Sequence, residues 1–206
     1  AITIDRESCP VKAAIGFLQV RPMVVAEGAV EVDVSQIRSS DILVYSPRAL
    51  GNDEVTSITD VVYVRPGSFE ARLTSVIASE IEEINRRLSE QGRQFLLIGF
   101  GRWGSSDPWL GIPVNWSQIS QAKSIVETSL ARINVEFSQG SHFFHNLTSF
   151  RVSYLSVGMN DQAKIDWDWL DNLPEITSTA YVRHVYTAKP LIIRVDGRHG
   201  KGVILK

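Results

Sequence analysis

The chain has 206 residues and a mass of 23.0 kDa, which is enough for one substantial domain or for one domain with a piece of another. Hydrophobic residues make up 44% and charged residues 21%, close to the globular average, and this composition argues against a disordered chain. The 21 Lys and Arg residues against 23 Asp and Glu residues give a net charge of −2, which argues against a protein that coats nucleic acid.

Membrane and disulfide chemistry are also disfavoured. The apolar runs, such as Val61–Val64 and Phe95–Phe100, fall well short of the roughly 18 residues that a membrane-spanning helix needs. The single cysteine, Cys9, excludes an internal disulfide and a zinc site of several thiolates. Because the chain starts at Ala1 without a charged and apolar leader, we expect no signal peptide and a cytoplasmic piece of a longer protein.

The first part of the chain carries strand signals. A β-rich segment at 15–23 is stopped by Pro22 and is typical of a terminal strand. Val30, Val32 and Val34 alternate with polar residues, which predicts a half-exposed strand. A further strand is predicted at 41–45, and a loop at 47–53.

The clearest unit runs from about 61 to 98. A strand of the buried type at 61–64 precedes a helix that is predicted from Phe69 to about Glu90, with Ser68 as its N-cap. Apolar residues recur along it at helical spacing: Leu73, Val76, Ile77, Ile81, Ile84 and Leu88. Gly92 stands where a C-terminal cap belongs, and a second buried strand follows at 95–98. This order predicts a βαβ crossover with parallel strands.

The remaining segments complete the fold prediction. We expect a loop at 99–113, strands at 124–128 and 150–157, and short helices at 139–148 and 165–170. Apolar strands are predicted at 181–186, 191–195 and 203–205, with a turn at 196–200. The predicted class is α/β: a mixed, partly parallel sheet with the βαβ unit at about 61–98, flanking helices, and antiparallel strands at the C-terminus.

The segment Gly99-Phe100-Gly101-Arg102-Trp103-Gly104 matches G-x-G-x-x-G and follows a predicted strand. A dinucleotide site is disfavoured because Pro108, Gly111 and Pro113 break the helix that must follow. One interpretation is a nest of accessible amides that binds phosphate or carboxylate; its candidate residues are Gly99, Gly101, Arg102, Gly104 and Asp107. The other is a structural turn whose tryptophans pack on the core.

Histidines and carboxylates elsewhere give weaker signals. His142 is a candidate catalytic residue, a donor or acid near the glycine loop, whereas His145 lies among phenylalanines and suits packing. No carboxylate or thiol stands near them at ligand spacing, so we predict no metal site. Asp166 and Asp168 alternate with tryptophans, which favours one solvated and one buried face over a paired-carboxylate site. His184 and His199 have no identifiable partner.

The segment Gly16-Phe17-Leu18-Gln19-Val20-Arg21-Pro22 resembles the closing strand of the ATP-grasp-like domain of phosphoenolpyruvate synthase and pyruvate, phosphate dikinase. The resemblance implies that Gln19 and Arg21 face the ATP phosphates, for which an amide and an arginine fork are suited. The family's acidic metal ligand precedes this strand and is expected upstream of Ala1. Glu7 is a less favoured substitute.

From about Glu27 onward the chain resembles the C-terminal region of a subset of long bacterial proteins of the phosphoenolpyruvate synthase type. The similar stretches are 101–107, 110–114 and 138–147. Two features of the true synthases do not fit: their Thr-Ser-His-Ala signature corresponds only to Gly140-Ser141-His142-Phe143, and their pyruvate-binding barrel is too large for the remaining chain.

The resemblance therefore implies two parts, a terminal strand segment of a nucleotide-binding domain at 1–27 and a C-terminal α/β domain at 28–206. The parent protein is expected to be an ATP-dependent phosphotransferase that uses ATP and Mg²⁺, with no cofactor in the fragment alone. The expected partners are the upstream nucleotide-binding domain and a small anionic substrate, with no nucleic acid and no membrane. The alternative is a non-catalytic regulatory or assembly domain attached to a kinase-like module.

Overall fold

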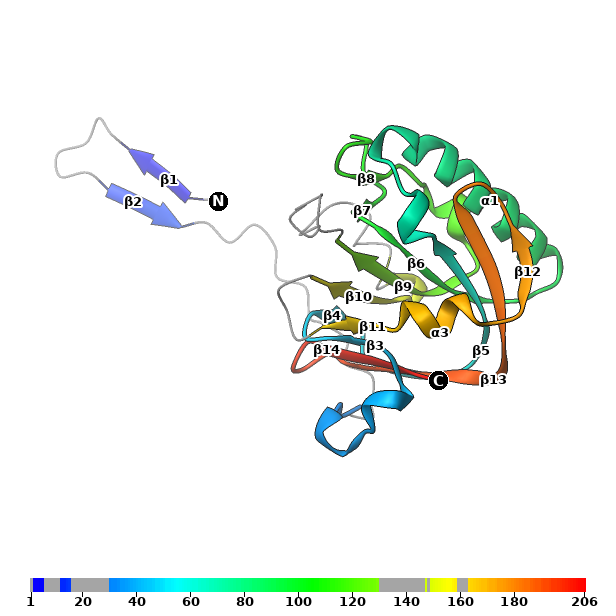
Figure 1. Ribbon diagram of the computed structural model, residues 1–206. Coiled ribbons are helices and arrows are strands. Elements are labelled where there is room, and N and C mark those ends of the chain that lie inside the picture. Colours follow the sequence, from blue (N-terminus) through cyan, green and yellow to red (C-terminus); the bar gives the residue numbers. More distant parts are fainter. Residues whose placement is uncertain (1, 6–11, 16–29, 130–146, 148, 159–162) are drawn as a thin grey trace.

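The computed structural model describes residues 2–5, 12–15, 30–129, 147, 149–158 and 163–206, the first two stretches as backbone alone. At the N-terminus β1 (Ile2–Asp5) pairs antiparallel with β2 (Lys12–Ile15). The other described residues form a curled mixed sheet with helix α1 on its outer face (Figure 1). The predicted α/β class with a mixed, partly parallel sheet is confirmed.

The large sheet has ten strands in the order β11-β3-β14-β13-β5-β6-β9-β10-β4, with β12 paired to β13 off this path. Its strands are β3 (Ile42–Ser46), β4 (Ala49–Leu50), β5 (Asp53–Val64), β6 (Phe95–Phe100), β9 (Ala122–Thr128), β10 (Ser153–Val157), β11 (Lys164–Ile165), β12 (Glu175–Ser178), β13 (Val182–Asp196) and β14 (Lys201–Leu205). The neighbours β5, β6, β9 and β10 run parallel, and the remaining pairs are antiparallel.

The sheet curls until its two ends meet. Strands β3 and β4 lie near opposite ends of the strand order, yet Pro47 and Arg48 alone separate them along the chain. At this seam the Ser46 hydroxyl donates to the carbonyls of Arg48 and Ser156, and the Ser156 amide donates to the Arg48 carbonyl at 2.9 Å. The bent β3–β4 segment therefore joins the antiparallel half of the sheet to the parallel half.

The βαβ unit is present as β5, α1 (Thr74–Glu90) and β6, with Asp60 beside Phe95 in the parallel register. The helix begins later than predicted, because the short 3-10 turns η3 (Pro66–Ser68) and η4 (Ala71–Leu73) precede it. Leu73, not Ser68, occupies the N-cap, and it makes no side-chain cap. Gly92, with φ of 63°, follows the helix as predicted, since L side chains rarely adopt that conformation.

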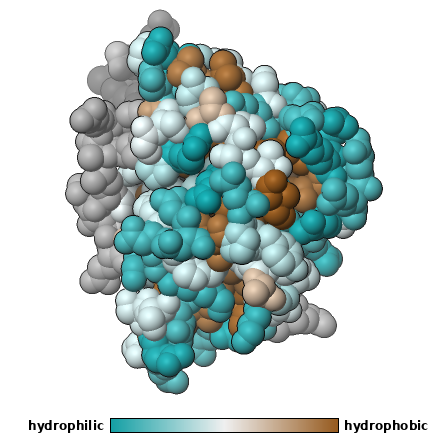
Figure 2. Space-filling model, turned by 45° about the vertical axis from the view of Figure 1, so that its right-hand side comes forward, coloured by the Kyte–Doolittle hydropathy of each residue, from teal (hydrophilic) through white to brown (hydrophobic). Residues whose placement is uncertain are grey.

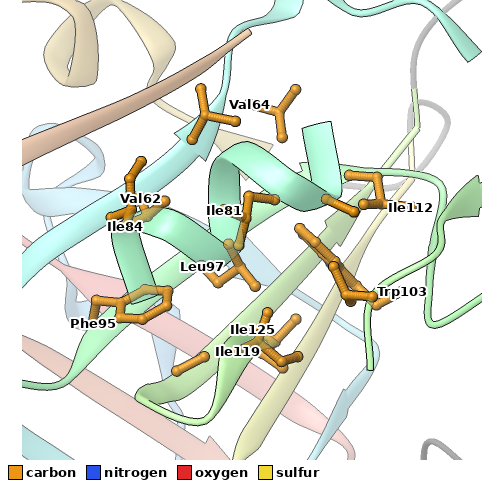
Figure 3. Close-up of a cluster of buried hydrophobic side chains, with 14 of the residues drawn as sticks. Val62, Val64, Ile81, Ile84, Phe95, Leu97, Trp103, Ile112, Ile119 and Ile125 are labelled. Carbon is orange, nitrogen blue, oxygen red and sulfur yellow. The ribbon is translucent and has the colours of Figure 1, made fainter. Parts of the chain in front are cut away.

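The two larger apolar clusters of the described residues stabilise the sheet. The first lies between α1 and the sheet, where Ile81 and Ile84 meet Val62, Phe95 and Leu97 (Figure 3). The second lies inside the curl and is contributed by strands β3, β4, β5, β6, β9, β10, β13 and β14 and by Leu170 of the short helix that follows β11. Burying each such side chain is worth about 1.5–3 kcal/mol relative to exposing it. Val76 is 46% exposed, so its predicted place in the buried stripe is wrong.

Several predicted elements change in extent. The strand predicted from Val30 to Val34 is wrong: Asp33 instead caps a 3-10 turn, η1 (Val34–Gln36). The strands predicted at 181–186 and 191–195 are one strand, β13, whose register shifts between Tyr186 and Leu191. The predicted helix at 165–170 is α3 (Trp167–Asp171), and most of the helix predicted at 139–148 lies outside the described residues. The remaining short elements are η2 (Ser39–Asp41), β7 (Arg102–Trp103), β8 (Gly111–Ile112) and η5 (Trp116–Ile119).

Candidate functional site

The glycine loop leaves the sheet at the carboxyl ends of its parallel strands. Phe100, the last residue of β6, is level with Thr128 of β9, which is level with Val157 of β10. This edge is where open α/β sheets place their ligands. Of the predicted site residues, Gly99, Gly101, Arg102, Gly104 and Asp107 lie here. Gln19, Arg21 and His142 lie outside the described residues.

The amides of the glycine loop are already used within the protein. The Gly101 amide donates to the Thr128 carbonyl at 2.9 Å, that of Arg102 to the Leu110 carbonyl at 2.8 Å, and that of Gly104 to the Ile112 carbonyl at 2.9 Å. These bonds join the loop to β9 and build the small parallel pair β7–β8. The expectation that the glycines leave these amides accessible to an anion is therefore wrong.

Packing explains why the loop needs its glycines. A Cβ on Gly99 would lie 2.4 Å from Cζ2 of Trp103, whose side chain is 1% exposed and whose indole N–H donates to the Val126 carbonyl at 3.2 Å. Gly101 has φ of 69°, and a Cβ there would lie 2.7 Å from the Leu110 carbonyl oxygen. These glycines let the Trp103 ring and a neighbouring backbone approach closely.

The charged residues of the loop have separate environments. Arg102 is half-buried at the carboxyl edge of the sheet. Asp107 is exposed, and its carboxylate accepts the Trp109 amide at 2.9 Å, so it stabilises the turn that carries Trp109. No ion pair joins Asp107 to Arg102 in the described part of the chain. Asp107 is therefore not the partner of Arg102, which takes part in another interaction.

The structure brings a second acidic group to this edge that the sequence analysis missed. Glu127, in β9, is 1% exposed and stands opposite Gly99 in the register. The Tyr154 hydroxyl donates to its carboxylate, and burial together with that carboxylate raises the pKa of Tyr154 well above its usual value. An acidic residue next to Ile125 and Val126 inside a predicted strand was the available signal, because a buried carboxylate needs a partner.

A closed ionic network lies at the other end of the parallel strands. The Asp60 carboxylate is 2% exposed and pairs with two groups: the Arg93 guanidinium, at an N–O distance of 2.7 Å, and Nε2 of His184, also at 2.7 Å. Asp60 is level with Phe95, the first residue of β6, so the network is remote from the glycine loop. It joins β5, β13 and the segment after α1, which indicates a structural role.

The other acidic and histidine candidates also have structural partners. The Asp196 carboxylate lies 2.7 Å from Nδ1 of His199 and accepts hydrogen bonds from the backbone amides of Arg198 and His199. These bonds lower the pKa of Asp196 and close the turn between β13 and β14. Asp166 is the N-cap of α3 and pairs with Lys206 at 2.6 Å, so the paired-carboxylate reading of Asp166 and Asp168 has no support from this geometry.

Across the described residues no cluster of three or more His, Cys, Asp or Glu side chains is arranged to hold a metal ion. In the same residues no helix is long and apolar enough to cross a membrane. Comparisons of the chain with protein-family models, with curated proteins and with solved structures found no match.

Proposed function

We propose that the chain is the C-terminal part of an ATP-dependent phosphotransferase resembling phosphoenolpyruvate synthase, and that its domain at 28–206 holds an anionic substrate or phosphoryl acceptor. In this proposal the upstream nucleotide-binding domain binds ATP and Mg²⁺, and Gln19 and Arg21 complete one wall of that site. The likeness of 16–22 to the closing strand of such a domain supports this part.

One observation carries the substrate-binding role, which is the position of Arg102. The residue follows β6 at the edge where β6, β9 and β10 all end, and its side chain is half-buried. A guanidinium in such a place offers a planar fork that matches phosphate or carboxylate oxygens. Because the amides of Gly101, Arg102 and Gly104 are used by protein carbonyls, the Arg102 side chain takes the role expected of the whole loop.

A second candidate is a non-catalytic regulatory or assembly domain, and the closed bonding of the loop favours it. The loop is fixed by its backbone bonds and by the buried Trp103, yet it leaves Trp109 67% exposed. An exposed indole is the kind of side chain that dominates protein interfaces. On the face seen in Figure 2 apolar residues are scattered in small groups among polar ones, so that face does not favour a large apolar interface.

Calorimetric titration of the chain with phosphoenolpyruvate, pyruvate, inorganic phosphate and Mg-ATP tests the proposal. We expect at least one of the small anions to bind, and Mg-ATP to bind more weakly than micromolar because most of the nucleotide site is missing. Micromolar affinity for Mg-ATP would contradict the assignment of Gln19 and Arg21 to one wall of a larger site. If none of the small anions binds, the substrate-holding role is wrong.

The variant Arg102→Ala separates the two candidates. In the anion-holding role it abolishes binding and leaves the melting temperature nearly unchanged. The matched control is Arg72→Ala, which removes an arginine that is 69% exposed and paired with Glu70, and which should preserve binding. If Arg102→Ala instead lowers the melting temperature by several degrees and binding falls only with unfolding, Arg102 is structural. Turnover of ATP with each anion by the longer protein, with and without Arg102→Ala, then tests catalysis.

A further inference from the structure

We draw no further inference here: the strongest candidate, the open apolar pocket of about 270 Å³ that Trp116 and Ile119 of η5 line together with Phe150 and Val152, carries nothing because the described part of the structure does not show what covers it.

Discussion

Replacing Asp60 by asparagine removes the carboxylate that Arg93 and His184 share. The side chain keeps its size, but its amide group turns a donor toward the donors of Arg93. Arg93 approaches Asp60 through two nitrogens, at 2.7 Å and 3.1 Å, and His184 approaches at 2.7 Å. Asp60→Asn therefore removes the negative charge and leaves a guanidinium and a buried imidazole to share a single acceptor oxygen.

The expected loss follows from the burial of the partners. Breaking a buried ion pair by removing one partner destabilises a protein by about 3–5 kcal/mol. The Arg93 side chain is 35% exposed and regains some hydration, whereas that of His184 is 6% exposed, so we place the loss near the lower end, about 3 kcal/mol. For a domain of this size that corresponds to a fall in melting temperature of roughly 6–12 °C.

Thermal and urea unfolding at pH 7, followed by circular dichroism, measure this loss. The matched control is Asp168→Asn, which removes an exposed carboxylate on α3 and should change stability by less than about 0.5 kcal/mol. A cycle with Arg93→Met and the double variant should show that the two replacements are not additive, since the residues are in contact. A loss below about 1 kcal/mol for Asp60→Asn, or strict additivity in the cycle, would refute the reasoning.

Three further predictions concern stability. Ile84→Asp places a charge in the core beneath α1 and should unfold the domain, whereas Val76→Asp on the exposed face of the helix should leave the domain folded. Equal melting curves of the two variants, followed by circular dichroism, would show that the buried and exposed faces of α1 are misassigned. Arg151 has φ of 51°, so Arg151→Gly should raise stability by about 1 kcal/mol, and a urea midpoint below wild type would contradict this. The pKa of Asp196 is lowered chiefly by its hydrogen bond to the His199 side chain. The ionised carboxylate therefore stabilises the fold at pH values above its ordinary pKa of 3.8, and this stabilisation is lost as the pH falls through the folded pKa. Asp196→Asn should flatten the acid limb of the stability–pH curve, and an unchanged limb would argue against this pairing.

Local patterns in the sequence determined the elements whose signals do not depend on distant contacts. The helical spacing of Ile77, Ile81, Ile84 and Leu88 predicted the buried face of α1, because one side of a helix repeats every 3.6 residues. Gly92 marked its end for a reason that is equally local, the left-handed conformation of a helix C-cap. The apolar runs around Val61 and Leu96 predicted parallel strands in one sheet, since a βαβ crossover favours that direction, and the structure pairs them directly.

Local patterns misled where a tertiary contact decided the outcome. The alternation around Val32 is that of a strand, but Asp33 forms a local cap and the segment finds no strand to pair with among the described residues. Val76 shares the helical spacing of the buried stripe, yet lies toward solvent at the first turns of α1. Propensity and spacing state what a segment can form, and the neighbouring surface decides which side chains it covers.

The tertiary structure alone decided how the candidate residues are used. The glycines at 99–104 suggested accessible amides, but those of Gly101, Arg102 and Gly104 meet carbonyls of β9 and of the 110–112 segment, and no local pattern encodes that contact. The pairing of Glu127 with Tyr154, like that of Asp60 with His184, joins residues far apart in the chain. Folding brings such partners together because a buried charge or polar group is stable only when another group satisfies it.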